Sequence, residues 1–352
     1  MTLRLRATLA ERGLDVDLTA PAGRTVALMG PNGSGKSTIL GIAAGLLRPD
    51  TGEVSLDGHV LTRLGADGRD ILVPPHNRHI ATLAQDPLLF PHLSVLENVA
   101  FAPRSRGVRR SEAHPAARHW LEQVGIPELA ERKPAQLSGG QAQRAAIARA
   151  LAADPGLLLL DEPMAALDVD VTPALRQVLR RVLEGRTAVI VTHDALDALM
   201  LADTIVVLGE GKVIEEGSAH DVLAQPRSAF AARIAGLNML EGSWVDGGVR
   251  TADGREVRGM VDGLTPANGA QAVAVFRPAA VSVFRDAPGG SPRNSLPVTV
   301  TAIEPQGDRV RLRAGSLIAD VTPQALAELD LTPGTQVTFT IKATEVTIYP
   351  TS

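Results

Sequence analysis

One short segment near the start of the sequence constrains the fold of this chain more than any other. Residues 30–38 read GPNGSGKST and match the phosphate-binding pattern G-x-x-x-x-G-K-[ST] in full. An apolar strand is predicted before it at 25–29, and a helical stretch after it at 37–47. Glycines let backbone N–H groups converge on phosphate oxygens, and the helix amino terminus adds a positive dipole. The sequence therefore predicts a strand–loop–helix unit that binds a nucleotide within an α/β domain.

The loop supplies the first set of candidate site residues. The candidate nucleotide-binding residues are Gly30, Pro31, Asn32, Gly33, Ser34, Gly35, Lys36, Ser37 and Thr38. We expect Lys36 to reach the β- and γ-phosphates and the Ser37 hydroxyl to ligate Mg²⁺. ATP and Mg²⁺ are thus the expected cofactors. A glycine-rich turn before an ordinary helix is the competing interpretation, and the flanking strand disfavours it.

A second candidate feature is the run of leucines at 157–160, which is followed by Asp161 and Glu162. Carboxylates at the end of a buried strand lie where open α/β sheets bind ligands. We expect Asp161 to hold Mg²⁺, directly or through water, and Glu162 to activate the attacking water as general base. Two acids after an apolar run are commonplace by themselves, but together with the phosphate loop they indicate a catalytic site.

Further motifs follow in a fixed order along the chain. Residues 137–141 read LSGGQ and open an alanine-rich helical stretch at 142–153. This segment resembles the signature sequence of ABC-type ATPases, and the resemblance covers residues 1 to about 235. Gln85 resembles the Q-loop glutamine of that family, residues 165–168 resemble its D-loop, and His193 resembles its switch histidine.

The resemblance implies a site shared between two chains, because ATPase domains of this family form a head-to-tail homodimer. Some residues would then contact the nucleotide bound to the opposite subunit or lie at the seam between the two subunits. They are Ser138, Gly139, Gly140, Gln141 and Asp168. His193 would contact the γ-phosphate and hold the water, and Gln85 would join the catalytic residues and the Mg²⁺ ligands. An ordinary helix N-cap at Ser138 and a structural histidine at 193 are the alternative interpretations.

Two positions depart from the family pattern. No Phe, Trp or Tyr precedes Phe90, so the aromatic residue that usually stacks on adenine is absent. We hypothesise that the planar guanidinium of Arg12 takes its place. The D-loop also begins with Ala165, where serine is usual, which removes one hydroxyl at the dimer seam. Neither departure touches the phosphate chemistry.

The spacing of the motifs favours transport over the other uses of this ATPase. Members in DNA repair, chromosome maintenance and translation carry long coiled-coil insertions or tandem ATPase domains. Here 53 positions separate Gln85 from Ser138, which leaves room for a small helical subdomain at about 86–153. The segment 86–98 resembles the importer Q-loop region that docks a membrane permease. Its apolar residues, Leu88, Leu89, Phe90 and Leu93, fit a buried core as well.

The composition and residue pattern of the sequence change beyond the ATPase domain, which we place at 1–235. Short segments rich in Val and Thr, separated by Gly, Pro or Asp, predict a smaller all-β domain at 240–352. The pattern weakly suggests two related halves, 240–290 and 291–352. On the strand at 336–342 we expect Val337, Phe339 and Ile341 to face inward and Thr338, Thr340 and Lys342 to share the other face.

This second domain has its own resemblances. Residues 276–278 resemble the marker of the OB-like TOBE domain of importer ATPases, and 291–296 with 341–346 resemble the molybdate-binding Mop module, at 291–352. A tetrahedral dianion needs several donors and no nearby carboxylate. The candidate oxyanion-binding residues are Ser291, Arg293, Asn294, Lys342 and Thr344. Ordinary exposed charges are the alternative interpretation of Arg293 and Lys342.

Together these resemblances imply an α/β P-loop ABC-type ATPase domain followed by a smaller all-β, OB-like (Mop/TOBE) domain. The implied function is ATP hydrolysis that drives molybdate or tungstate import, with oxyanion sensing by the second domain. The alternatives are another cargo (sulfate, iron, polyamine or sugar) or a chain that is mainly an oxyanion-binding regulator. The absence of cysteine excludes thiolate zinc sites and cysteine nucleophiles.

The implied partners are a second copy of the chain, integral membrane permease subunits and, indirectly, an external substrate-binding protein. We expect no nucleic-acid partner, because a net charge of −4 gives no basic field. The sequence shows no signal-peptide pattern and no apolar run long enough to span a bilayer. We therefore expect a cytoplasmic protein that is peripheral on the inner face of the cell membrane.

Overall fold

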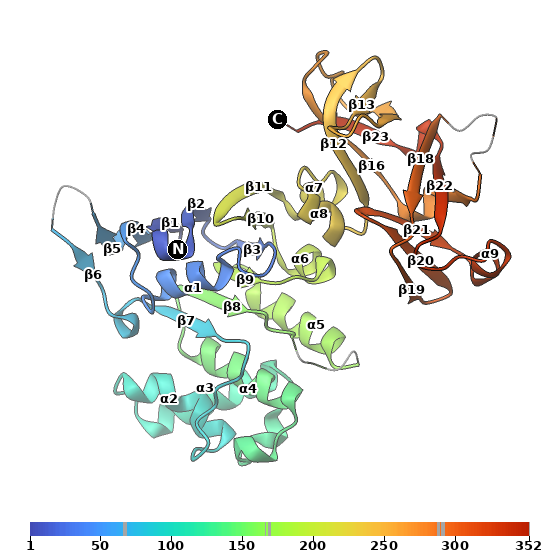
Figure 1. Cartoon of the computed structure of the whole chain (residues 1–352). Coiled ribbons are helices and arrows are strands. Elements are labelled where there is room, and N and C mark those ends of the chain that lie inside the picture. The colour runs from blue at the N-terminus through green and yellow to red at the C-terminus, as the bar shows by residue number, and fades with distance from the viewer. Residues whose placement is uncertain (66–68, 166, 168–169, 287–288, 290–292, 352) are drawn as a thin grey trace. The chain divides into compact units, whose positions relative to one another are not determined.

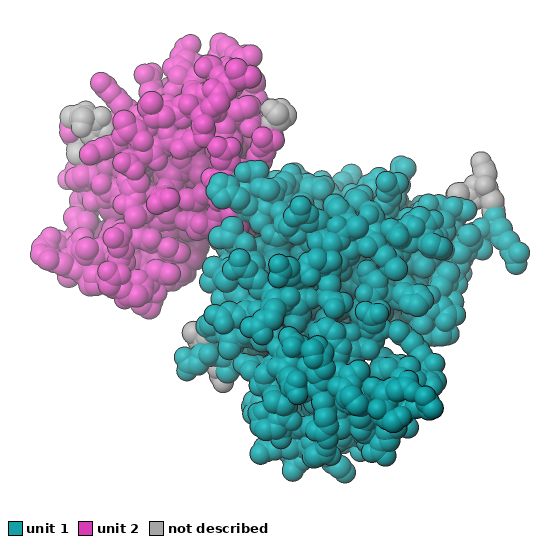
Figure 2. All heavy atoms as spheres, turned by 180° about the vertical axis from the view of Figure 1, so that it is seen from behind, with its two compact units in different colours: residues 1–222 teal, residues 223–352 magenta. Residues whose placement is uncertain are grey.

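The computed structural model describes residues 1–65, 69–165, 167, 170–286, 289 and 293–351 (Figure 1). They form two compact units, Met1–Val222 and Leu223–Ser352, which are coloured separately in Figure 2. The change of domain between 235 and 240 remains a prediction from composition. By its contacts, helix α8 (Ala229–Ile234) belongs to the second unit.

An antiparallel sheet forms one layer of the first unit, with the strand order β2-β1-β4-β5-β6. Its strands are β1 (Leu3–Leu9), β2 (Leu14–Ala20), β4 (Thr51–Leu56), β5 (His59–Leu64) and β6 (Ile71–Leu72). Alternate residues of β1 are buried, which confirms the alternation predicted at Leu3, Leu5, Ala7 and Leu9. One face of this sheet therefore packs on the core, and the other is exposed along β1 and β2.

The second sheet of this unit carries the predicted buried strands, in the order β11-β10-β3-β9-β8-β7. They are β3 (Thr25–Met29), β7 (Ile80–Leu83), β8 (Leu157–Asp161), β9 (Ala188–Val191), β10 (Thr204–Gly209) and β11 (Lys212–Ser218). All neighbours pair in parallel except β10 and β11. The sheet divides two cores, because Leu157 and Leu159 pack on one side and Leu158 and Leu160 on the other. Burial on both faces explains why these strands read as unbroken apolar runs.

Helices cover the parallel sheet and extend from it. Those of the first unit are α1 (Lys36–Ala44), α2 (Val95–Ser105), α3 (Arg110–Gln123), α4 (Gly139–Ala152), α5 (Thr172–Leu183), α6 (Ala195–Leu201) and α7 (Ala219–Ala224), whose last residues lie in the second unit. Helix α1 packs against β7, β8 and β9. Helices α2, α3 and α4 pack on one another as a separate group (Figure 1) and lie within the segment 86–153.

The second unit is rich in strands. Its elements are α8, β12 (Asn238–Val245), β13 (Gly248–Arg250), β14 (Glu256–Arg258), β15 (Met260–Val261), β16 (Gln271–Phe276), β17 (Ser282–Phe284), β18 (Asn294–Thr299), β19 (Ala302–Gln306), β20 (Arg309–Ala314), β21 (Leu317–Val321), α9 (Pro323–Glu328), β22 (Gln336–Ile341) and β23 (Thr347–Pro350). They form three sheets, ordered β14-β13-β12-β16-β23-β15, β17-β22-β18 and β19-β20-β21. One shared core lies between these sheets.

The two halves of the second unit, 240–290 and 291–352, exchange strands; that they are related remains a prediction from the sequence. The last strand of each half pairs with a strand of the other half, β17 with β22 and β23 with β16. Each half also begins with a buried asparagine that binds the backbone of the other. Asn238 exchanges hydrogen bonds of 2.7 and 2.8 Å with Ile318, and Asn294 exchanges bonds of 2.7 and 2.9 Å with Arg258. The halves are therefore interlocked around the core that they share.

Strand β22 is buried on both of its faces. Val337, Phe339 and Ile341 are buried as predicted, but Thr338 and Thr340 are also buried, at 7% and 2% exposure. β22 is the central strand of its sheet, between β17 and β18, so its backbone is paired along both edges. Gln336 at the start of the strand and Lys342 just beyond its end are exposed.

A fully buried arginine joins the phosphate-loop helix to the antiparallel sheet. Arg78 is 1% exposed and donates hydrogen bonds to the carbonyls of Ile42 and Ala43 at 3.2 and 3.1 Å. It also donates to the Val73 carbonyl at 2.8 Å and to the Thr62 hydroxyl at 2.9 Å. These bonds satisfy carbonyls at the carboxyl end of α1, where a positive charge also complements the helix dipole.

We expect Arg78→Met to lower the free energy of unfolding by about 3 kcal/mol, because buried carbonyls lose their donors. Urea unfolding of the nucleotide-free protein measures the change. Arg63→Met is the matched control, since the ion pair of Arg63 with Glu53 is 39% and 47% exposed. The control should cost no more than about 1 kcal/mol. Equal costs for the two variants would contradict the role assigned to Arg78.

Candidate active site

Parallel pairing brings the predicted catalytic residues to one edge of the sheet. Asp161, at the end of β8, pairs with Val191, two residues before His193. On the other side of β8, Leu160 pairs with Leu83, two residues before Gln85. Because parallel strands end at the same edge, the loops that carry these residues lie together, beside the phosphate loop that follows β3.

The phosphate loop has a backbone that only glycine accommodates at two positions. Gly30 has φ +149°, and a Cβ there would lie 2.4 Å from the Leu208 carbonyl oxygen. Gly35 has φ +103°, and its Cβ would lie 2.6 Å from Leu14 Cδ1. The glycines of the motif are thus required by the neighbouring strands as well as by close approach of the backbone to a ligand.

Lys36 and Ser34 give the loop its anion-binding character. Lys36 Nζ donates to the carbonyls of Gly30 and Pro31 at 2.8 and 2.9 Å. Burial lowers the pKa of Lys36, while the charges of Glu162 and Asp161 oppose that shift and favour the ammonium. The Ser34 hydroxyl is buried and has no hydrogen-bond partner among the described residues. An orphaned buried hydroxyl beside an enclosed ammonium is what a phosphate oxygen would satisfy.

A pocket of about 510 Å³ opens over this loop. Its lining residues are Arg12, Asn32, Gly33, Gly35, Lys36, Ser37, Thr38, Glu162 and Val191. Arg12 Nη1 donates to Thr38 Oγ1 at 3.2 Å, which holds the guanidinium beside the phosphate loop. The structure thus places Arg12 at the phosphate pocket. This is the position expected for a residue that replaces the adenine-stacking aromatic side chain, which this chain lacks.

Asp161 and Ser37 form a pair of oxygen ligands at the end of β8. Burial raises the pKa of Asp161, and a hydrogen bond with the Ser37 side chain opposes the rise. A carboxylate beside a hydroxyl fits Mg²⁺, which is commonly held by one or two carboxylates together with substrate phosphates. The described residues contain no group of three or more His, Cys, Asp and Glu side chains that would hold a metal ion by itself. The site thus fits a metal ion that binds together with nucleotide.

Glu162 and His193 face each other across the same edge. Their side chains approach to 3.3 Å between Oε1 and Nδ1 and are 24% and 68% exposed. Glu162 has φ +45°, and its N–H donates to the Val191 carbonyl at 3.0 Å, so β9 fixes the unusual backbone. Glu162 lines both the phosphate pocket and a cavity of about 140 Å³ that His193 also lines. This is the geometry of a base whose side chain is oriented by a neighbouring imidazole.

The signature residues lie elsewhere in the chain. Ser138 caps helix α4, where its hydroxyl accepts from Gln141 N–H at 3.4 Å and its N–H donates to Gln141 Oε1 at 3.0 Å. Neither residue lines the phosphate pocket, nor do Gly139 and Gly140. A Cβ at Gly139 would meet nothing within 4 Å, so this position is open. Asp168 lies outside the described residues.

Sequence reasoning missed an arginine that connects two of these motifs. Arg149, on the helix that begins with the signature segment, donates to the carbonyls of Pro87 and Leu88 at 3.0 and 2.7 Å. Its guanidinium carbon lies 5.5 Å from the centre of the Phe90 ring. Burial lowers the pKa of Arg149. No local pattern separates Arg149 from other arginines of the chain, and only the packing of α4 beside the segment after β7 reveals it.

The oxyanion candidates are only partly brought together. Asn294 pairs with Ile341 across β18 and β22, so Arg293 and Lys342 lie at the same end of this ladder. Both are exposed, and neither forms an ion pair with a described residue. Asn294 is fully buried, and its amide is engaged with the Arg258 backbone.

The other two oxyanion candidates give less support to a shared site. Thr344 lines a cavity of about 740 Å³ with Arg277 and with the carboxylates of Asp262, Asp320 and Glu345. The acidic groups outnumber the single cation, which is unfavourable for a dianion. Ser291 lies outside the described residues. Within the described part of the chain, the oxyanion hypothesis therefore depends on Arg293 and Lys342.

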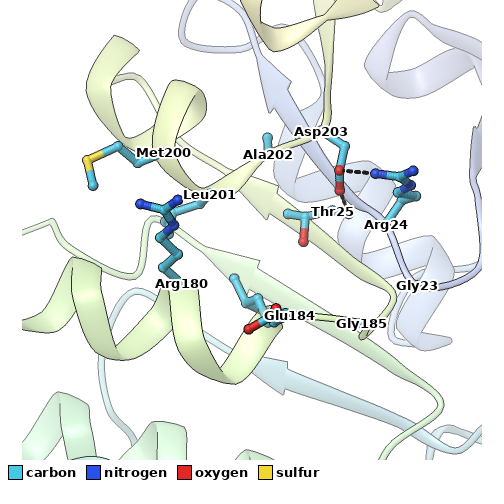
Figure 3. Close-up of a pocket in the computed structure, with 11 residues that line it drawn as sticks. Gly23, Arg24, Thr25, Arg180, Glu184, Gly185, Met200, Leu201, Ala202 and Asp203 are labelled. Carbon is cyan, nitrogen blue, oxygen red and sulfur yellow. Dashed lines mark hydrogen bonds and ion pairs between the residues drawn. The ribbon is translucent and has the colours of Figure 1, made fainter.

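A separate cavity of about 420 Å³ lies at the opposite edge of the parallel sheet, beside the amino ends of β3 and β10 (Figure 3). An ion pair crosses part of it, with 2.6 Å between Arg24 Nη1 and Asp203 Oδ1. Asp203 also accepts the Thr25 N–H at 2.9 Å. Arg180 and Glu184 line the same cavity. None of the predicted catalytic residues lines it, so the candidate active site is the pocket at the carboxyl edge.

The described residues contain no helix that combines the length and apolar character needed to cross a membrane.

Comparison with known proteins identifies both parts of the chain. A family model described as ABC transporter matches residues 14–165, and a TOBE domain model matches residues 290–348. The chain is 47% identical to the molybdenum import ATP-binding protein ModC of Mycobacterium tuberculosis, over 99% of this chain and 97% of that protein. It is 34% identical to the molybdate/tungstate import ATP-binding protein WtpC of Pyrococcus horikoshii, over 96% and 95%.

Two further comparisons cover a smaller share of the chain. An Fe(3+) ions import ATP-binding protein of Brucella abortus is 40% identical over 78% of this chain and 77% of its own length. The solved dimeric structure of an ATP-binding cassette in a post-hydrolysis state, bound to ADP and phosphate, is 35% identical with a TM-score of 0.54. That match covers 62% of this chain and 98% of the solved chain. These findings confirm the predicted fold class and the ATPase assignment: the chain belongs to the family of ABC transporter ATP-binding proteins and carries a TOBE domain.

Proposed function

We propose that this chain hydrolyses ATP to drive the import of molybdate or tungstate through a separate membrane permease. The assignment of the cargo depends on sequence similarity over nearly the whole chain. The relatives compared above that align over more than nine-tenths of it are named for molybdenum or molybdate/tungstate import. The relative named for iron import aligns over 78% of the chain. Iron, sulfate, polyamine or sugar import is the second candidate function, with the same ATPase chemistry.

The proposed hydrolysis uses the residues at the carboxyl edge of the parallel sheet. Lys36 and the backbone of the phosphate loop bind the phosphates and orient the terminal one. Glu162 accepts the proton of the attacking water, and His193, 3.3 Å away, holds the Glu162 carboxylate in place. Ser37, Asp161 and Gln85 would hold Mg²⁺, which supplies charge neutralisation of the phosphates when bound.

A second copy of the chain would complete the site. Ser138, Gly139, Gly140 and Gln141 do not line the phosphate pocket of their own chain, although helix α4 presents its amino terminus and an open Gly139. Backbone N–H groups at a helix start bind anions well. The dimeric structure of a related cassette supports a homodimer in which these residues, and Asp168 of the D-loop, contact the partner's nucleotide.

The segment after β7 is the proposed docking site for the permease. Leu88 is 67% exposed with φ +44°, and Phe101 is 45% exposed beside Phe90, at 4.5 Å between ring centres. Exposed large apolar side chains of this kind suit a protein interface. Arg149 connects this segment to the signature helix. The chain would thus work at the inner face of the membrane, and an external substrate-binding protein would reach it only through the permease.

The second unit is proposed to sense the oxyanion. Arg293 and Lys342 supply two exposed cations at one end of the β18–β22 ladder, without an ion-pair partner among the described residues. Guanidinium and ammonium groups suit a tetrahedral dianion. A chain that acts mainly as an oxyanion-binding regulator is the alternative from another class, and tight oxyanion binding without ATP hydrolysis would favour it.

Glu162→Gln should lower kcat for ATP at least about a hundredfold, because the amide cannot accept the proton of water. ATP binding, measured by equilibrium titration, should stay within a factor of about two, since no phosphate contact is lost. Glu184→Gln is the control, because Glu184 lines the cavity at the opposite edge of the sheet. Near-normal hydrolysis by the Glu162 variant would refute the assignment of the base.

Arg12→Ala should weaken ATP binding by about three- to thirtyfold, the range expected for one cation–π or stacking contact. Binding of inorganic tripolyphosphate, which lacks a base, should change much less. Arg12→Lys keeps the charge but loses the plane, so it should resemble the alanine variant if stacking is the cause. Unchanged ATP affinity in both variants, measured by fluorescence titration, would rule out the adenine contact.

Calorimetry of the full-length protein with molybdate, tungstate and sulfate tests the oxyanion site. We expect heat with molybdate and tungstate, and its loss in Arg293→Ala and Lys342→Ala, because each variant removes one of the two cations. Arg309→Ala, an exposed arginine on β20, should bind as the wild type does. If none of the three anions gives heat, the sensing proposal fails while the import assignment stands.

A further inference from the structure

A buried ion pair between two helices lies directly beneath the His193 loop. Arg176 on α5 and Asp197 on α6 have side chains that are only 9% and 7% exposed. The guanidinium contacts Asp197 Oδ1 from Nη2 at 2.5 Å and from Nε at 2.7 Å. Burial raises the pKa of Asp197, and the hydrogen bond from Arg176 opposes that rise. Because desolvation offsets much of the attraction in a buried pair, stability alone is a weak reason for this arrangement.

Asp197 is bonded to both neighbours of His193 in the chain. The Thr192 hydroxyl donates to Asp197 Oδ2 at 3.5 Å and accepts the Asp194 N–H at 3.1 Å. Asp194 Oδ1 in turn accepts the N–H of Asp197 at 3.0 Å, as the N-cap of α6. His193 therefore stands between Thr192, which is bonded to the Asp197 carboxylate, and Asp194, which is bonded to the Asp197 backbone. Its own side chain is 68% exposed, so packing does little to hold the imidazole.

The ion pair also lies beside the candidate catalytic residues. Asp197 lines the 140 Å³ cavity that Glu162 and His193 line. We propose that Arg176 and Asp197 are positioning residues that hold the His193 loop so that the imidazole stays within reach of Glu162 during hydrolysis. The proposal rests on the ATPase function proposed above and adds two residues that lie outside the recognised motifs.

The test is the double variant Arg176→Met/Asp197→Leu, which replaces the ion pair with apolar side chains of similar volume. Such replacements are often neutral for stability, so the thermal midpoint should stay near that of the wild type. We expect kcat for ATP hydrolysis to fall at least about tenfold, since small displacements of catalytic groups are costly, while ATP affinity changes less than about twofold. A purely structural role would move the midpoint and leave kcat per folded molecule intact.

Arg311→Met/Asp320→Leu is the matched control in the second unit. Arg311 and Asp320 form a partly buried pair with contacts of 2.8 and 3.0 Å, and neither lines the phosphate pocket. This control should hydrolyse ATP at the wild-type rate. A folded Arg176→Met/Asp197→Leu variant with wild-type kcat would overturn the proposal.

Two further variants keep the test decisive if the double variant does not fold. Thr192→Val removes the hydroxyl that bonds Asp194 and Asp197 but keeps the side-chain shape, and it should lower kcat without weakening ATP binding. In a His193→Ala background, Thr192→Val should cause no additional loss, because the residue being positioned is gone. An equal further loss in that background, or no effect of Thr192→Val in the wild type, would contradict the proposal.

The wild-type protein separates this inference from the proposed function. Hydrolysis by the wild type together with normal kcat in the variants would refute the positioning role alone. Absence of hydrolysis by the wild type would instead refute the ATPase proposal on which the inference rests.

Discussion

The candidate active site depends on the parallel pairing of four strands. Because β3, β9, β8 and β7 run in the same direction, the loops that follow them meet at one edge of the sheet. The residues that carry the chemistry span Gly30 to His193. Gln85, Glu162 and His193 lie within two residues after a strand end, and Lys36 and Ser37 open the helix that follows the phosphate loop. Burial of the sheet on both faces makes that edge rigid, so the backbone strain at Glu162 can be maintained.

Arginines that are buried or half-buried join the elements around this sheet. Arg78 ties the helix of the phosphate loop to the antiparallel sheet, and Arg149 ties the signature helix to the proposed docking segment. Arg176 ties α5 to α6 beneath His193. In each case one guanidinium makes two or more contacts. Its planar, fixed arrangement of N–H donors suits this better than the single ammonium group of a lysine. This chain has only four lysines, and its arginines supply the buried cations that link elements.

The second unit follows a different principle, in which two halves complete each other. The exchange of β17 and β23 and the asparagines at 238 and 294 make each half dependent on its counterpart. The sequence suggested two halves only weakly, because the residues they share are few. It did not show that Asn294 and Thr338 are buried, because the packing that covers them joins segments far apart in the chain.

The sequence by itself determined the phosphate loop, the order of the ATPase motifs and the change to a β-rich second part, because these depend on residue type and short-range spacing. It also determined Lys36, Asp161 and Glu162 as candidates, since their neighbours form recognisable local patterns. Only the tertiary structure decided that Arg12 lines the nucleotide pocket and that Arg149, Arg176 and Asp197 connect the motifs. Such contacts join residues far apart in the chain, and their energies come from burial and geometry, which no local pattern encodes.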